Sequence, residues 1–222
     1  MSASLRLILF DVDGTLVDSQ AAIVGAMTDA FGSIGLPVPT RPEILSIVGL
    51  SLDRAMTRLA PQGNAETQAA LVEGYKSAYH QARMQAGAGH SPLYPGARAT
   101  LEALNAVPEY LLGVATGKSQ RGMEGLIEAH DLTCFVTRQV ADHHPSKPHP
   151  SMILTAMAET GVTPEHTVMI GDTSFDMDMA RAAGVRSIGV PWGYHPVDRI
   201  GADHVISSFA DLLPLLNGLW KA

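Results

Sequence analysis

The chain has 222 residues, of which 46% are apolar and 17% are charged, and its formal net charge is −7. This length allows one large domain or two small ones and buries enough apolar surface to fold without a metal staple or disulfide, and the single cysteine, Cys134, excludes an internal disulfide. The excess of acidic side chains excludes the basic surface that a nucleic-acid backbone or an anionic membrane attracts. An acidic protein that binds an anion must therefore concentrate its positive charge locally.

The amino end does not have the pattern of a signal peptide, because it reaches a charge too early. Nowhere do 18 consecutive apolar residues occur, as a membrane-spanning helix would need. We therefore expect a soluble, cytoplasmic protein that binds neither membrane nor nucleic acid.

Short apolar blocks of strand length recur along the chain. They occupy residues 5–10, 110–115, 167–170, 186–190 and 204–206. Stretches with helical spacing lie between them, and this alternation predicts parallel strands joined by right-handed crossovers, with helices on both faces of the sheet. The expected fold class is α/β, with a Rossmann-like parallel sheet as its core.

The interval after the first block predicts helices and no strand. Four residues typical of helix N-termini occur in it, each followed by apolar residues at helical spacing: Ser19, Thr40, Ser51 and Asn64. A glycine-rich run at 86–92 then has the composition of a hinge. The expected domains are an α/β core of residues 1–18 and 92–222 and an inserted α-helical cap of residues 19–91.

The first apolar block ends in Asp11-Val12-Asp13-Gly14-Thr15. Two carboxylates two positions apart point to the same side if the strand continues, and Gly14 lets the chain turn. Such a pair at the end of a strand can hold a hard cation such as Mg²⁺ and leave one oxygen free to attack phosphorus. The alternative is an ordinary turn, because Asp, Gly and Thr all favour turns.

The second block ends in Ala115-Thr116-Gly117-Lys118-Ser119. This segment is not a nucleotide-binding P-loop, because Leu112 stands where that motif requires its first glycine. The hydroxyl of Thr116 and the free amides at the start of the following helix can still bind phosphate. Lysine side chains are usually exposed, so we expect Lys118 to face water.

Two further motifs follow. Lys147 precedes a proline at a helix start, where it is either a partner for a phosphoryl oxygen or carboxylate, or an ordinary surface lysine. The next strand block ends in Gly171-Asp172, where Asp172 caps the turn, and Asp176 lies four residues later on the same side of the first helical turn. The alternative is that these acidic residues only interact favourably with the dipole at the start of the helix. However, open α/β sheets bind ligands along one edge, which favours a single site.

Together these four motifs resemble those of the haloacid dehalogenase superfamily, in its phosphatase branch, which also inserts a helical cap after the first motif. The resemblance implies an aspartyl-phosphate formed on Asp11, with Asp13 as the acid that protonates the leaving oxygen and then the base that activates water. It also implies a phosphoryl group held by Gly14, Thr116, Gly117 and Lys147. Finally, it implies Mg²⁺ bound by Asp11, the Asp13 carbonyl and Asp172, with Asp176 supporting.

The segments 189–194, 202–206 and 48–51 resemble phosphoglycolate phosphatases and their pyrophosphatase relatives. In that family, the last of these segments is the specificity loop, so Gly49, Ser51 and Arg54 are candidate specificity residues; a solvated Arg54 is the alternative. The resemblance implies a Mg²⁺-dependent phosphatase of a small phosphomonoester, with phosphoglycolate as first candidate, acting as a monomer or homodimer.

Three alternatives stay open. Two belong to the same superfamily, a pyrophosphatase and a sugar-phosphate mutase, although mutases of this superfamily usually carry Glu-Asp in place of Gly171-Asp172. The third, from a different class, is a catalytically silent regulatory module that binds phosphate. The phosphonate-cleaving branch of the superfamily uses a cap lysine as a Schiff base. Lys76 is the one lysine of the expected cap, and we expect it to be solvated instead.

Overall fold

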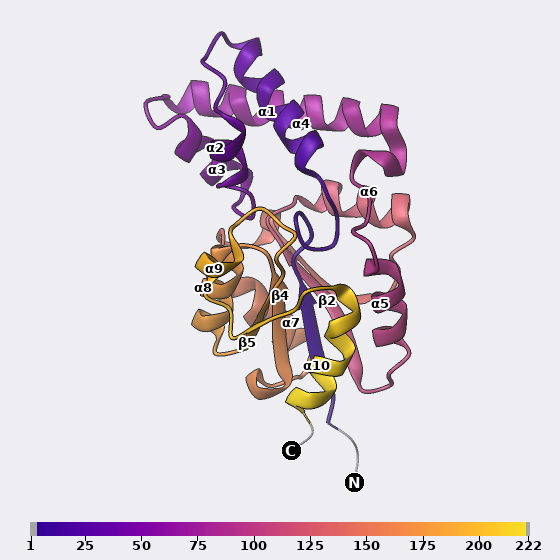
Figure 1. The fold of residues 1–222 in the computed structure, drawn as a ribbon. Helices are drawn as coiled ribbons and strands as arrows, with labels where there is room; N and C mark the ends of the chain where they lie inside the picture. Colours follow the sequence, from indigo (N-terminus) through magenta and orange to yellow (C-terminus); the bar gives the residue numbers. More distant parts are fainter. Residues whose placement is uncertain (1–3, 221–222) are drawn as a thin grey trace.

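The computed structural model describes residues 4–220, and a six-stranded sheet forms the centre of its larger part (Figure 1). The strands lie in the order β3-β2-β1-β4-β5-β6, and every neighbouring pair is parallel. Their bounds are β1 (Arg6–Phe10), β2 (Tyr110–Thr116), β3 (Phe135–Val140), β4 (Thr167–Gly171), β5 (Arg186–Gly189) and β6 (His204–Val205). The chain order reverses at β1, so the carboxyl ends of β1, β2 and β4 meet at a topological switch point.

Strand β1 is buried on both faces, because its side chains alternate between two apolar clusters. Ile8 and Phe10 pack in the cluster that contains helices α5, α6 and α10. Leu7 and Leu9 pack in the cluster that contains α7 and α8. The helices around the sheet are α5 (Ala97–Asn105), α6 (Gln120–His130), α7 (Ser151–Thr160), α8 (Ser174–Ala183), α9 (Val197–Ile200) and α10 (Leu212–Leu219).

Strand β3 was not predicted from the sequence, although the other five strands coincide with the apolar blocks. It forms one edge of the sheet and is buried only at alternate positions, so Val136 is 60% exposed and Arg138 faces solvent. An edge strand with one solvated face alternates apolar and polar residues and therefore does not form an apolar block.

A group of helices above the carboxyl ends of the strands forms a separate layer, which we call the cap (Figure 1). They are α1 (Gln20–Ser33), α2 (Arg41–Leu45), α3 (Leu52–Leu59) and α4 (Ala65–Ala86). The cap has its own apolar cluster, which includes Met27, Phe31 and Met56. Helices α1 and α4 cross closely at Gly74 of α4. A Cβ there would lie only 3.3 Å from the Cα of Ala30 on α1.

The helix starts follow the predicted signals. α2, α3 and α4 begin directly after Thr40, Ser51 and Asn64, and α1 begins directly after Ser19. Ser19, however, makes no capping bond, since its hydroxyl contacts a carboxylate of the core instead. Within residues 4–220, no helix combines the length and hydropathy needed to cross a membrane.

Candidate active site

The predicted site residues come together where the sheet meets the cap. Asp11 directly follows β1, Thr116 ends β2, and Asp172 directly follows β4. Because β1 lies between β2 and β4, these three positions are neighbours along one edge of the sheet. Asp176 joins them from the first turn of α8, and Lys147 reaches them from the segment between β3 and α7.

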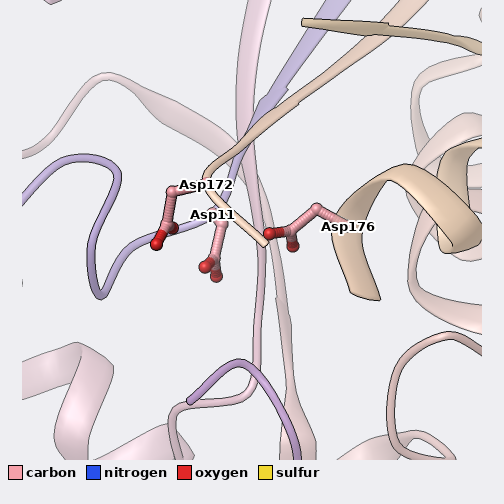
Figure 2. A group of neighbouring side chains, drawn as sticks. All are labelled: Asp11, Asp172 and Asp176. Carbon is pink, nitrogen blue, oxygen red and sulfur yellow. The ribbon is translucent and has the colours of Figure 1, made fainter. Parts of the chain in front are cut away.

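The carboxylates of Asp11, Asp172 and Asp176 form a buried cluster, with Asp11 in the middle (Figure 2). One oxygen from each lies within 4.8 Å of the others. The Lys147 ammonium lies 2.9 Å from Asp11 Oδ1 and 2.6 Å from Asp176 Oδ1. Three ionised carboxylates and one ammonium leave a net charge of −2, which a divalent cation would neutralise.

The electrostatics of the cluster oppose full ionisation. Burial raises the pKa of Asp11 from 3.8 to about 7, against the opposing effect of Lys147 and with a further increase from Asp176. Burial also raises the pKa of Asp172, and the charges of Asp11 and Asp176 add to this effect. Oδ2 of Asp11 is buried and has no hydrogen-bond partner within residues 4–220. An unpaired buried carboxylate oxygen is costly, so it points to a ligand.

Asp172 is held rigidly by its neighbours. Its Oδ1 accepts a hydrogen bond from Thr15 Oγ1 at 2.8 Å, and its Oδ2 accepts one from the Tyr194 N–H at 2.8 Å. The backbone also approaches it closely, because a Cβ on Gly14 would lie 2.3 Å from Oδ2 and one on Gly193 would lie 2.1 Å from the Asp172 Cβ. Gly14 also has φ +87°, a backbone conformation that favours glycine. Position 14 therefore needs glycine both for this conformation and for the close approach to Asp172.

Asp176 rather than Asp172 takes part in capping α8, so the expectation that Asp172 caps this turn was wrong. The N-cap of α8 is Thr173, and Asp176 Oδ2 accepts hydrogen bonds from its N–H at 3.0 Å and its hydroxyl at 2.7 Å. This capping box leaves Asp176 Oδ1 directed at Lys147. The helix start therefore orients the lysine that contacts Asp11.

Asp13 lies outside the acidic cluster and has partners of its own. Its Oδ1 accepts a hydrogen bond from the Ser19 hydroxyl at 2.6 Å, and its Oδ2 lies 2.9 Å from the Lys118 ammonium. Our expectation that Lys118 faces water was wrong, since its side chain is only 7% exposed. Its ammonium also donates to the Tyr79 hydroxyl at 3.1 Å. Burial lowers the pKa of Lys118, but Asp13 and Tyr79 outweigh this effect and raise it overall.

A cavity of about 560 Å³ separates this edge of the sheet from the cap. Its core side includes Asp11, Asp13, Thr116 and Gly117. Its cap side is mostly apolar and includes Ile23, Met27, Ile47, Val48, Leu50 and Val72, together with Tyr75 and Tyr79. Of the three candidate specificity residues, Gly49 and Ser51 line the cavity. Arg54 is exposed and is not among the lining residues.

The loop before α3 closes directly onto the core. A Cβ on Gly117 would lie 2.6 Å and 2.7 Å from the carbonyl oxygens of Gly49 and Leu50. The N–H of Ser51 donates to the Ser146 hydroxyl at 2.9 Å, next to Lys147. The cap loop is therefore in contact with two of the four predicted motifs.

The segment after β5 connects the core to the cap. The Tyr194 hydroxyl accepts a hydrogen bond from the Ser19 N–H at 3.1 Å, in addition to the bond that its own N–H makes to Asp172. The next residue, His195, donates from Nε2 to the Ser46 carbonyl at 3.2 Å. This segment thus contacts the acidic cluster, the start of α1 and the cap loop.

Three residues of the site were missed by sequence reasoning: Lys118, Tyr75 and Tyr79. The scarcity of lysine was a usable signal for Lys118, because the chain has only four lysines. Nothing in the sequence pattern distinguishes the two tyrosines from ordinary residues of a cap helix.

The comparisons with known proteins agree with this geometry. A family model of haloacid dehalogenase-like hydrolases matches residues 8–190. The probable phosphatase IndB of Dickeya dadantii is 34% identical, over 97% of this chain and 95% of its own length. A phosphoglycolate phosphatase of Salmonella paratyphi A is 29% identical, over 96% of this chain and 93% of its own length.

Solved structures extend the likeness to the whole fold. The crystal structure of a predicted phosphoglycolate phosphatase from Haemophilus somnus has a TM-score of 0.80 at 25% identity and covers 97% of this chain and 99% of its own. A hydrolase from Pseudomonas syringae has a TM-score of 0.83 at 26% identity, with coverage of 97% and 99%. With the family model matching most of its length, this chain belongs to the haloacid dehalogenase-like hydrolases.

Proposed function

We propose that this chain is a Mg²⁺-dependent phosphatase that hydrolyses a small phosphomonoester through an aspartyl-phosphate on Asp11. The observation that carries the proposal is Oδ2 of Asp11, which lies in a buried cluster with Asp172 and Asp176 and has no hydrogen-bond partner among residues 4–220. A carboxylate oxygen kept free of hydrogen bonds is available to a cation or to phosphorus. The relatives named phosphatases support the same reaction.

The acidic cluster fits Mg²⁺ in its donor chemistry. It offers only oxygen ligands, which this hard cation prefers, and it carries an excess negative charge. Asp11, Asp172 and the carbonyl of Asp13 would hold the ion, with Asp176 supporting. When bound, Mg²⁺ supplies charge neutralisation for the phosphoryl oxygens.

The reaction has two steps. In the first, the Asp11 carboxylate attacks phosphorus, the bond between phosphorus and the ester oxygen breaks, and Asp13 gives its proton to the departing alkoxide. In the second, Asp13 takes a proton from water, the resulting hydroxide attacks the aspartyl-phosphate, and inorganic phosphate leaves with Asp11 regenerated. Such a reaction depends mainly on positioning and charge stabilisation.

The phosphoryl group is held by the residues around Asp11. Lys147 is buried and contacts Asp11, so its charge lies where phosphoryl oxygens arrive. Thr116 and Gly117 line the cavity just before α6. The expectation that the amides at the start of this helix are free was wrong for two of them, since the N–H of Gln120 donates to Asp142 Oδ2 at 2.6 Å and that of Gly122 donates to the Ser119 hydroxyl at 3.2 Å. Gly14 brings the backbone close to the carboxylate of Asp172.

The cap, for which we propose residues 19–91, covers the reaction from solvent. Its loop contacts Gly117 and Ser146, and the cavity lies between it and the core of residues 1–18 and 92–222. Exclusion of bulk water protects an aspartyl-phosphate until the leaving group departs. Phosphoglycolate is the first substrate to test, because several relatives are named for it.

The test is phosphate release by the purified protein with Mg²⁺ from a panel of phosphomonoesters and from pyrophosphate. We expect turnover of at least one small phosphomonoester, and none by the Asp11→Asn variant. Faster turnover of pyrophosphate would instead support the pyrophosphatase alternative. No turnover, together with failure to trap a fluoride-based phosphate mimic on Asp11, would support the regulatory module.

A further inference from the structure

Two lysines whose side chains are almost inaccessible to solvent contact carboxylates, but they are paired differently. The Lys147 ammonium lies between two carboxylates, those of Asp11 and Asp176. The Lys118 ammonium contacts one carboxylate, that of Asp13, and one neutral hydroxyl, that of Tyr79. An ammonium has three N–H donors, so Lys118 retains one that has no partner within residues 4–220.

The unpaired donor of Lys118 belongs to a side chain that lines the cavity and is 7% exposed. Tyr75 lines the same cavity, stacks on Tyr79 with ring centroids 5.7 Å apart, and makes no hydrogen bond within the described part of the chain. Lys118 and Tyr75 therefore offer a charged and a neutral donor that both lie next to Tyr79. A desolvated cation with a spare N–H is best satisfied by an anionic oxygen.

The position of this pair specifies where the anionic group sits on the substrate. Asp13 is the residue proposed to protonate the ester oxygen, and Lys118 contacts its carboxylate at 2.9 Å. A group that binds Lys118 while the ester oxygen faces Asp13 lies close to that oxygen, which favours a substituent on the adjacent carbon.

The other basic side chains of the cavity differ from Lys118. Lys76 is exposed and pairs with Glu73 at 2.9 Å. Arg121 is exposed and donates to His80 at 2.9 Å, and Arg83 donates to the Arg121 carbonyl at 3.4 Å. Among the lysines and arginines of residues 4–220 that line the cavity, Lys118 is thus the one that contacts Asp13.

We propose that Lys118, assisted by Tyr75, forms a subsite for a carboxylate on the carbon next to the ester oxygen, so that the substrates are phosphate esters of 2-hydroxy acids. The inference rests on the phosphatase function proposed above. Phosphoglycolate is the smallest such ester. The apolar wall formed by Ile23, Met27 and Val72 accommodates a side chain on the same carbon.

The test compares phosphoglycolate with 2-hydroxyethyl phosphate, which has the same skeleton but an uncharged group in place of the carboxylate. We expect kcat/KM of the wild type to be at least about tenfold higher for phosphoglycolate, as a charge-assisted hydrogen bond predicts. Lys118→Met should reduce this ratio to about one. The matched control, Lys76→Met, removes a charge from the same cavity and should keep the ratio.

Substitution of Lys118 also disturbs Asp13, and for that reason the ratio, rather than the rate, is the readout. Loss of positioning alone lowers both rates equally and leaves the ratio unchanged, which would overturn the subsite. Equal kcat/KM values in the wild type would overturn it too, whereas turnover of neither ester would contradict the phosphatase function itself.

A second measurement needs no variant. The non-hydrolysable 3-phosphonopropionate places a methylene where phosphoglycolate has its ester oxygen, and propylphosphonate lacks the carboxylate. We expect the first to inhibit the wild type at least about tenfold more strongly. Equal inhibition by the two compounds would overturn the carboxylate subsite even if Lys118→Met fails to fold.

Discussion

The two sides of the cavity are built in different ways. On the core side, Asp11, Thr116 and Asp172 come from the ends of adjacent strands, so the sheet itself determines their spacing. On the cap side, the lining residues come from α1, α3, α4 and the loop between α2 and α3, and their positions depend on how the cap lies on the core. Changes on the core side should therefore abolish the reaction, and changes on the cap side should alter its efficiency and selectivity.

The strongest test of the core side is Asp11→Asn, which keeps the shape of the side chain and removes the nucleophile. We expect kcat to fall by at least about 10⁴-fold, measured as phosphate release. Asp178→Asn is the matched control, because Asp178 is exposed on α8 and pairs with Arg181. Residual activity of Asp11→Asn above about one per cent would place the chemistry on another residue.

Removal of the metal should have the next largest effect. With a chelator we expect activity to fall by about 10³-fold or more and to return with Mg²⁺. At 100-fold excess over its Kd, Mg²⁺ should stabilise the protein by about 2.7 kcal/mol and raise Tm by roughly 5–11 °C. Asp172→Asn should reduce that shift, and an unchanged shift would exclude Asp172 as a ligand.

The contact between the two sides can be tested with Gly117→Ala. The new Cβ would lie 2.6 Å from the Gly49 carbonyl oxygen, so the cap loop must move away. We expect kcat/KM to fall by about 10- to 100-fold, because small misplacements of positioning groups cost this much. The far-UV circular dichroism should be unchanged.

A control for this substitution is Gly25→Ala on the exposed side of α1, where a Cβ would meet nothing within 4 Å. It should preserve activity and stabilise α1 by about 0.5–1 kcal/mol. Equal activity of Gly117→Ala and Gly25→Ala would show that the cap loop does not need this contact.

The pH dependence of stability tests the burial of the acidic cluster. In the metal-free protein, the pKa of Asp11 is raised from 3.8 to about 7, so between these values the native state binds more protons than the unfolded state. The free energy of unfolding should therefore decrease as pH rises from about 4 to 7. Denaturant titrations with a chelator should show this decrease, and Asp11→Asn should reduce it. Increasing stability over that range would contradict the raised pKa.

The core side of the site could be predicted from the sequence because its residues stand next to strands. Asp11 and Asp172 directly follow apolar blocks, and parallel strands bring such positions together. Strand β3 escaped prediction because its solvated face breaks the apolar pattern, with Val136 60% exposed.

The cap side could not be predicted in the same way. Lys118 is buried partly by Tyr79, which is 39 residues earlier in the chain, so local pattern carries no information on its exposure. Arg54 is the opposite case. It lies one helical turn after Ser51 and was a candidate specificity residue, but its side chain is exposed. Both depend on the orientation of the cap, which follows from tertiary packing alone.

The segment around Tyr194 has a practical consequence for protein engineering. Its N–H binds Asp172, its hydroxyl binds Ser19 at the start of α1, and His195 binds the cap loop at Ser46. A chimaera that receives the helices of another family member but keeps this segment would combine a foreign cap with a connector fitted to the old one. Specificity transplants into this scaffold should therefore move residues 192–195 together with the cap.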